Sequence, residues 1–276
     1  MNRKSTLLIA LSLMTGTLFT QNSFAACIPL QQASLVTAGT LKMATNPTLP
    51  PMQYVDGQGQ LKGMRVELGE EIAKRLCLKP DYTRIEFSAM VPGLQGGRWD
   101  MINTGIFYTP ARAKIMYMIP YENQAISISV VPTAADSIKR VEDLSGKSVG
   151  VEMGGFEEAA IRKISKTREE KNLKPIEIHT FDNFSVAFQA LRAGQVSAVI
   201  SIDAVAADYQ HKGIFKQVLS GMEATPVAIA FKDPVLAAAA AEALNQMNAD
   251  GTLPALFNKY GAKMISGTFS VHGPGA

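Results

Sequence analysis

The chain has 276 residues, of which 47% are hydrophobic, 18% are charged and 7% are aromatic. This composition is typical of a globular protein and excludes a disordered or collagen-like chain. The 27 basic and 24 acidic side chains give a net charge of +3. No basic block concentrates that charge, so nucleic acid and anionic membranes are not expected partners. Two cysteines exclude a disulfide-dense small domain and a four-cysteine zinc site.

The first 25 residues have the pattern of a secretory signal peptide. A short basic start at residues 1–4 precedes an apolar run at residues 7–14, and Ser23 and Ala25 are the small residues that a signal peptidase reads. The apolar run is too short to span a bilayer as a helix of the mature protein. We therefore expect residues 1–25 to be removed and the mature protein to be soluble in the periplasm.

Export changes the interpretation of the two cysteines. In an oxidising compartment an even pair is most simply a disulfide, here between Cys27 and Cys77. The entropy of closing a loop of about 50 residues gives such a bond roughly 4 kcal/mol. The alternative is lipidation of Cys27, because small residues precede it, although Phe24 stands where a lipidation site usually has Leu. We favour the disulfide.

The first half of the mature chain alternates between strand and helix patterns. Strands are predicted at residues 41–45, 83–87 and 99–103, and helices at residues 64–76 and 88–97, the second capped by Ser88. This β-α-β-α-β order predicts a parallel sheet covered by helices.

The same order then repeats. Strands are predicted at residues 125–131, 149–151, 176–180 and 196–201, and helices at residues 156–167, 184–193 and 204–211. One more strand at residues 227–231 and two helices, starting at Pro234 and Thr252, are too little for a third domain. We expect this tail to pack on the first unit.

The predicted fold class is therefore α/β, with two α/β lobes. The first lobe is discontinuous, with residues 26–128 plus 228–276, and the second has residues 129–227. Two crossing strands, near residues 125–131 and 225–231, form the hinge between them. A ligand cleft is expected between two lobes that are joined in this way.

Signatures of catalysis and of cofactors are mostly absent. His179, His211 and His272 lie far apart and lack the spacing of metal ligands. The sequence has no Gly-x-Ser-x-Gly motif, no phosphate-binding loop and no paired-cysteine motif. We expect no catalytic residue, no metal site and no cofactor.

Residues 109–112 carry the most informative local motif. Thr109 can cap a helix that starts at Pro110, which makes Arg112 the third helical residue. A helix N-terminus offers free N–H groups and the positive end of a dipole, and a guanidinium binds a carboxylate in a two-pronged manner. The motif alone is equally consistent with a carboxylate site and with a solvated surface arginine.

Several segments, taken in order, resemble the bacterial extracellular solute-binding proteins of family 3, the type II periplasmic receptors of polar amino-acid ABC importers. The similar segments are residues 41–52, 57–68, 99–112, 141–150 and 248–252. The similarity runs from about Gly39 to Gly261, nearly the whole mature chain.

The resemblance implies ten ligand-binding residues. Arg112 falls on the family's carboxylate-binding arginine, whereas Asp203 lies one residue after the position of its amine-binding acid, which here is Ile202. The other eight are Gly105, Phe87, Phe107, Phe156, Gly155, Asn46, Leu49 and Met52. Phe156 lacks the hydroxyl that family members usually have there, and Asn46 stands where some carry Asp. These departures argue against an ordinary α-amino acid.

The function that the resemblance implies is capture of a small carboxylated, nitrogen-containing solute for an ABC importer. Arg112 would hold the carboxylate, Asp203 a cationic nitrogen, and closure of the lobes would bury the ligand. The expected partners are this ligand and the membrane permease, and the protein is expected to be a monomer. Two alternatives stay open: a periplasmic enzyme similar to dehydratases of this fold, with Asp203 or Glu157 as acid or base, and a soluble sensor.

Overall fold

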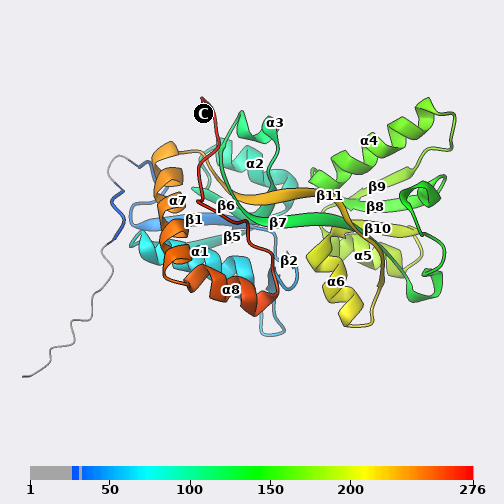
Figure 1. Cartoon of the computed structure of the whole chain (residues 1–276), viewed down its shortest axis with the longest axis horizontal. Coiled ribbons are helices and arrows are strands. Elements are labelled where there is room, and N and C mark those ends of the chain that lie inside the picture. The colour runs from blue at the N-terminus through cyan, green and yellow to red at the C-terminus, as the bar shows by residue number, and fades with distance from the viewer. Residues whose placement is uncertain (1–26, 31–32, 276) are drawn as a thin grey trace, which may run out of the picture.

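The computed structural model describes residues 27–30 and 33–275, so the signal peptide expected at residues 1–25 lies outside the described residues. The described chain forms two α/β lobes side by side (Figure 1). One eight-stranded sheet runs through both lobes in the order β5-β1-β6-β11-β7-β10-β8-β9. Among the described helices, none combines the length and the apolar character that a membrane span requires.

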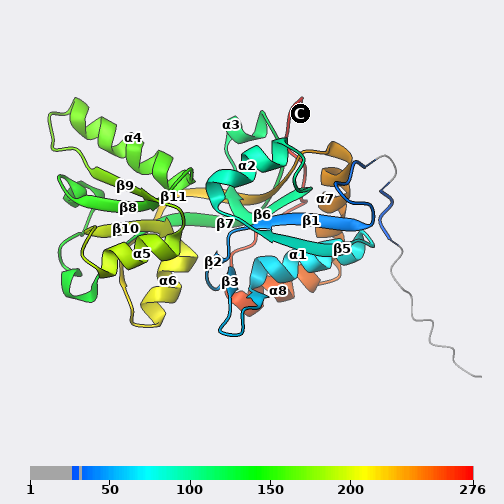
Figure 2. The ribbon, with the colours of Figure 1, turned by 180° about the vertical axis from the view of Figure 1, so that it is seen from behind.

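The first lobe is built on three parallel strands. They are β1 (Thr40–Thr45), β5 (Lys79–Arg84) and β6 (Met101–Phe107). Its helices are α1 (Met64–Arg75), α2 (Phe87–Gln95), α3 (Pro110–Ala113), α7 (Pro234–Ala249) and α8 (Thr252–Tyr260). A small antiparallel sheet contains β2 (Thr48–Leu49), β3 (Gln53–Val55) and β4 (Leu61–Lys62). Helices α1 and α2 cover opposite faces of the large sheet (Figure 2), so the sheet is buried on both sides.

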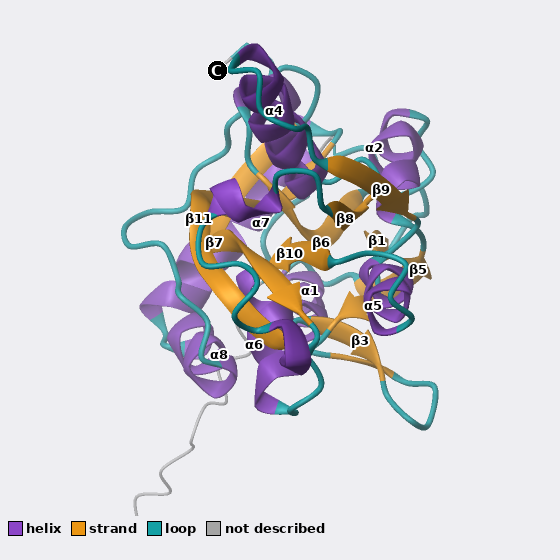
Figure 3. Ribbon diagram, turned by 90° about the vertical axis from the view of Figure 1, so that its right-hand side faces the viewer, coloured by secondary structure: helices purple, strands orange, loops and turns teal. Residues whose placement is uncertain are grey.

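The second lobe repeats this arrangement with three parallel strands. They are β8 (Ser148–Glu152), β9 (Glu177–Phe181) and β10 (Ala198–Ile202). Its α-helices are α4 (Phe156–Glu170), α5 (Phe184–Arg192) and α6 (Asp203–His211), and its short 3-10 helices are Pro132–Ala134 and Val141–Leu144. Figure 3, seen from this end of the molecule, shows α4 and α6 on opposite sides of the strands.

Two long strands connect the lobes. β7 (Tyr117–Val130) and β11 (Lys216–Phe231) pair with each other in antiparallel fashion, while β11 also pairs with β6 in the first lobe and β7 with β10 in the second. Their register is irregular from Gln217, which faces Ser129 in the second lobe, to Thr225, which faces Gln124. The expected crossing segment at residues 225–231 lies within β11, and the one at residues 125–131 lies within β7 except for its last residue. Both strands are longer than predicted.

The predicted boundary between β5 and α2 is wrong. The alternation at residues 83–87 predicts a strand through Phe87, but β5 ends at Arg84 and Phe87 is the first residue of α2. Glu86, not Ser88, occupies the N-cap position, and it makes no side-chain cap bond. Burial explains the helix, because Phe87, Met90 and Leu94 present one apolar face to the core.

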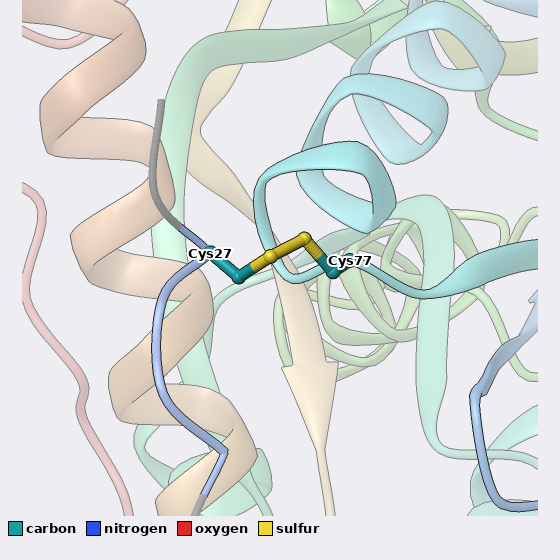
Figure 4. The surroundings of a disulfide bond; sticks show 2 residues. All are labelled: Cys27 and Cys77. Carbon is teal, nitrogen blue, oxygen red and sulfur yellow. A yellow bond between two sulfur atoms is a disulfide. The ribbon is translucent and has the colours of Figure 1, made fainter. Parts of the chain in front are cut away.

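The disulfide between Cys27 and Cys77 is present, as predicted (Figure 4). The two Cα atoms lie 5.6 Å apart, and the residues are separated by 50 positions in the sequence. The Ile28 amide also donates to the Arg75 carbonyl, at 3.0 Å. The bond therefore fastens the first described residues to the end of α1, and it occupies the sulfur that lipidation of Cys27 would need.

A buried charge network ties α1 to the crossing strand β7. The Arg65 side chain is fully buried in the first turn of α1 and donates through Nη2 to Glu122 Oε2 and through Nε to the Tyr121 hydroxyl, both at 2.9 Å. Its Nη1 donates to Gln53 Oε1 and to the Thr104 carbonyl. Arg65 thus holds together α1, β3, β6 and β7.

Candidate functional site

A small enclosed cavity of 20 Å³ lies where the two lobes meet. Its walls come from both lobes: Leu49, Phe87, Thr104, Gly105, Phe107, Glu152, Phe156, Glu157, Phe184 and Ile202. This volume holds about one water molecule, so the structure shows the site closed. Because charged, polar and aromatic groups of both lobes converge here, we take this cavity as the candidate ligand site.

Arg112 stands beside this cavity, at the start of α3. The Thr109 hydroxyl accepts a hydrogen bond from the Arg112 amide at 3.1 Å, which confirms the predicted cap. The guanidinium donates to the carbonyl of Phe107 at 2.9 Å and to that of Gly154 at 3.4 Å. Phe107 belongs to the first lobe and Gly154 to the second, so Arg112 bridges the lobes.

The side chain of Arg112 is half-buried. It lies over the ring of Phe87, 5.4 Å from the centroid. Burial lowers the pKa of Arg112, against the opposing effect of the nearby Glu157 carboxylate. Among the described residues, no carboxylate oxygen lies within the 4.0 Å of an ion pair with Arg112. A half-buried cation without an acidic partner favours an incoming anion, and a carboxylate suits its planar fork.

Two carboxyl groups of the second lobe reach the same cavity. Glu152 ends β8 and Glu157 is the second residue of α4, and each is only 3% exposed. The Asn46 side chain donates across the lobe boundary to Glu152 Oε1 at 2.5 Å. Burial, together with the charges of Glu157 and Glu86, raises the pKa of Glu152 well above its ordinary value. Burial likewise raises the pKa of Glu157 to about 7.

Aromatic rings form the apolar wall of the cavity. Phe107 from β6 and Phe156 from α4 stack across the lobe boundary, with ring centroids 4.5 Å apart and an interplanar angle of 25°. An amino acid is much larger than the 20 Å³ that remains. An amino acid therefore does not fit between the walls while these two rings stay stacked.

Gly105 has a clear steric role in the floor of the site. Its φ is +74°, and a Cβ at this position would lie 2.1 Å from Arg65 Cζ. The backbone of β6 therefore passes directly against the buried guanidinium, which only glycine permits.

A second and larger cavity, of 660 Å³, lies beside the crossing strands and α6. Asp203 lines this cavity, where its carboxylate accepts hydrogen bonds from the Ser127 hydroxyl and the Gly221 amide. Met52 lines it as well. The other ionisable side chains that line it are Asp208, His211 and Lys263. Within the described part of the chain, no group of three or more His, Cys, Asp or Glu side chains is arranged to hold a metal ion.

Comparison with known proteins decides the family. Residues 41–263 match the bacterial extracellular solute-binding proteins, family 3. The chain belongs to this family. It is 27% identical over 228 residues to the L-cystine-binding protein TcyJ of Escherichia coli (strain K12), a match that covers 80% of this chain and 82% of the relative.

Solved structures of the family confirm the predicted two-lobed fold. An ancestral arginine-binding protein bound to arginine is 34% identical, with a TM-score of 0.74 and coverage of 80% of this chain and 98% of that chain. The ancestral amino acid-binding protein AncCDT-1, described as a precursor of cyclohexadienyl dehydratase, is 29% identical, with a TM-score of 0.72 and coverage of 80% and 95%.

Within this family fold, the structure brings together most of the expected ligand-binding residues. Five of them line the small cavity: Leu49, Phe87, Gly105, Phe107 and Phe156. Three more lie beside it. Arg112 donates to the carbonyl of the lining residue Phe107, and Asn46 donates to the lining residue Glu152. Gly155 is the N-cap of α4, directly before the lining residue Phe156. Met52 and Asp203 lie at the other cavity, so the structure does not bring Asp203 to Arg112.

Sequence reasoning missed Glu152, Thr104 and Phe184 as lining residues, and considered Glu157 only as a catalytic acid or base. One signal could have found Glu152. Glu152 ends a buried strand and precedes the Gly154-Gly155 turn by two residues, so it lies at the edge where ligands of α/β sheets bind.

Proposed function

We propose that this protein captures an amino acid or a related small carboxylated amine between its lobes in the periplasm, and delivers it to the membrane permease of an ABC importer. Relatives named as cystine- and arginine-binding proteins support this proposal. We also propose that the protein acts as a monomer, does not bind nucleic acid and releases its ligand chemically unchanged.

The observation that carries the proposal is the half-buried guanidinium of Arg112. It lies at the cavity, has no carboxylate partner among residues 27–30 and 33–275, and contacts both lobes. A ligand carboxylate that replaces the carbonyl of Gly154 as its partner would hold the two lobes together. Binding and closure are thereby coupled through one side chain.

We propose that the lobes move as two bodies, residues 26–128 plus 228–276 and residues 129–227, about β7 and β11. Ligand entry requires an open form, since the stacked rings of Phe107 and Phe156 block the closed one. Small-angle scattering of the unliganded and the saturated protein tests this point. A smaller radius of gyration at saturation supports the proposal, and an unchanged radius contradicts it.

The decisive experiment removes the guanidinium. Native mass spectrometry of the protein from its own periplasm identifies the ligand, and isothermal titration then compares the wild type with Arg112→Ala, Arg112→Lys and the exposed control Arg84→Ala. Loss of a buried charged partner costs about 2–5 kcal/mol, or roughly 30- to 4000-fold in affinity. Arg112→Lys is expected to recover only part, because an ammonium lacks the fork geometry. Wild-type affinity in Arg112→Ala would reject the carboxylate site.

A second candidate function is supported by Glu157. This carboxyl group has a pKa raised to about 7 and lines the cavity. A buried acid of this kind can donate a proton to a leaving hydroxyl group at neutral pH, and the similarity to the dehydratase precursor AncCDT-1 adds weight. Incubation with a carboxylated cyclohexadienol, followed by mass spectrometry, separates the two functions. Catalytic conversion of the substrate to an aromatic product, with loss of one water and one carbon dioxide, supports the enzyme, because the C–C bonding pair that the departing carboxylate leaves behind replaces the pair that leaves with the hydroxyl group. Unchanged substrate supports the binding protein.

A further inference from the structure

The cavity between the lobes has more acidic than basic side chains around it. Glu152 and Glu157 line it, each 3% exposed, and Glu86 lies close enough to raise the pKa of Glu152. Arg112 is the cation beside them. A ligand that brought only a carboxylate to Arg112 would leave the two buried acids without any positive partner.

Glu157 is the clearer example of a buried acid that lacks a positive partner. Its carboxyl group is buried, lines the cavity and is stabilised by hydrogen bonding only to its own backbone amide among the described residues. Glu152 receives one hydrogen bond, from Asn46 of the other lobe. Buried carboxylates are normally paired or multiply hydrogen-bonded. Both groups are therefore free to accept donors from a ligand.

The wall of the cavity limits the kind of cation that fits. Four phenylalanines line it: Phe87, Phe107, Phe156 and Phe184. Phenyl faces attract cations whose hydration is weak, such as guanidinium and alkylated ammonium groups, and offer no hydrogen bonds to replace the water around a primary ammonium. The protein already places one guanidinium, that of Arg112, over the ring of Phe87.

We propose that Glu152 and Glu157 form a cation subsite, which accepts a guanidinium or N-alkylated ammonium group of a ligand whose carboxylate is held by Arg112. The inference rests on the proposed function, since it assigns the other end of the same ligand. In it, the two glutamates take the role that the sequence assigned to Asp203, whose carboxylate is engaged at the larger cavity.

Two pairs of shape-matched probes test the charge requirement. L-Arginine and L-citrulline differ in one group, a guanidinium against an uncharged ureido group. γ-Butyrobetaine and 5,5-dimethylhexanoate differ in one atom, a quaternary nitrogen against carbon. We expect isothermal titration to show at least about 30-fold tighter binding of the charged member in one pair, and the pair that responds tells guanidinium from alkylated ammonium. Equal affinity within both pairs, or no binding of either charged probe, overturns the subsite.

Matched variants assign the effect to the two glutamates. Glu157→Gln and Glu152→Gln keep the shape of the protonated side chains, so the fold is expected to persist, as circular dichroism checks. Each is expected to reduce the affinity for the probe with the guanidinium or quaternary ammonium group at least about 30-fold. The affinity for its ureido or carbon counterpart is expected to stay nearly unchanged. Glu170→Gln, at the exposed far end of α4, makes the same change of charge and is expected to have no effect. Unchanged affinity in both cavity variants contradicts the proposal.

Proton release gives an independent readout. The groups that face Glu157 and Glu152 are Arg112 and Glu86 from the first lobe, with Asn46 as hydrogen-bond donor. The closed, empty site holds protons on its acids, because the pKa of Glu157 is about 7. A bound cation displaces them, so affinity rises as the pH rises toward 7, by up to about tenfold per pH unit for each proton released. Titration in buffers of different ionisation enthalpy counts these protons, and a count of zero refutes the mechanism.

The outcomes separate the subsite from the function. If L-citrulline and 5,5-dimethylhexanoate bind through Arg112 as tightly as L-arginine and γ-butyrobetaine, the proposed function is supported and the cation subsite is rejected. If Arg112→Ala has no effect while Glu157→Gln weakens binding, the cation subsite stands and the carboxylate site falls.

Discussion

Removing the charge of Glu122 is expected to destabilise the protein strongly. Arg65 and Glu122 are both fully buried, and their ion pair spans 2.9 Å between α1 and β7. Glu122→Gln keeps the shape of the side chain but leaves a buried guanidinium without its counter-charge. Loss of one partner of a buried pair costs about 3–5 kcal/mol, a large part of the roughly 5–15 kcal/mol by which proteins are stable.

Urea unfolding followed by circular dichroism measures this effect. With a denaturant slope of about 3 kcal/mol per M, the midpoint is expected to fall by roughly 1–2 M. The control is Glu67→Gln, on the same helix as Arg65, which removes the partner of Lys259 from a part-exposed ion pair of 2.7 Å between α1 and α8. Exposed pairs contribute about 0–1 kcal/mol. Equal shifts in the two variants would refute the view that burial makes Glu122 essential.

Three further predictions follow from the fold and the site. Serine at both Cys27 and Cys77 is expected to lower the free energy of unfolding by about 4 kcal/mol, because the loop has about 50 residues; a thiol titration that finds two free thiols in the unreduced wild type contradicts the bond. Gly105→Ala is expected to cost at least about 2 kcal/mol and to weaken ligand binding, since its Cβ would lie 2.1 Å from the buried guanidinium; Gly97→Ala, with φ +70° and open space, isolates the strain of positive φ. The pKa of Glu157 is about 7 in the folded protein and 4.5 ordinarily, so protonated Glu157 contributes up to about 3 kcal/mol of stability below pH 4.5 that is lost as the pH rises to 7. Thermal unfolding of the empty protein between pH 5 and 7 is expected to show stability falling with pH. Glu157→Gln is expected to reduce this dependence on pH.

The order of strands and helices was predictable because burial leaves a periodic pattern. The apolar positions of residues 64–76 recur every four residues, and α1 occupies Met64–Arg75. The pattern at residues 83–87 predicted the wrong end of the strand. Alternation over five residues is also compatible with a strand that ends and a helix that begins within them. The full lengths of β7 and β11 were missed, since each contains exposed residues where it passes between the lobes.

The carboxylate end of the site was more predictable than the cation end. Arg112 follows a Thr-Pro cap, a local signal that fixes where its side chain starts. Asp203 was chosen because it lies one residue after the position of the family's amine-binding acid, which here is Ile202. Neighbouring residues of a chain point in different directions, and Ile202 lines the small cavity whereas Asp203 lines the large one. Glu152 was passed over, because a glutamate in a sequence is expected to be exposed. Its burial depends on the contact with Asn46 from the other lobe, which no local pattern contains.

The irregular register between β7 and β11 makes the two connections between the lobes mechanically unequal. From Gln217 to Thr225, β11 advances eight residues while β7 advances only five, from Ser129 to Gln124. β11 therefore contains three more residues than β7 over this stretch, which runs from the second lobe, where Ser129 also pairs with β10, to the lobe boundary. When the lobes rotate, β7 can keep a constant length, whereas the extra residues of β11 allow that strand to extend or to shorten. Shortening β11 at this point would then restrict the opening of the molecule without touching a residue that lines the small cavity.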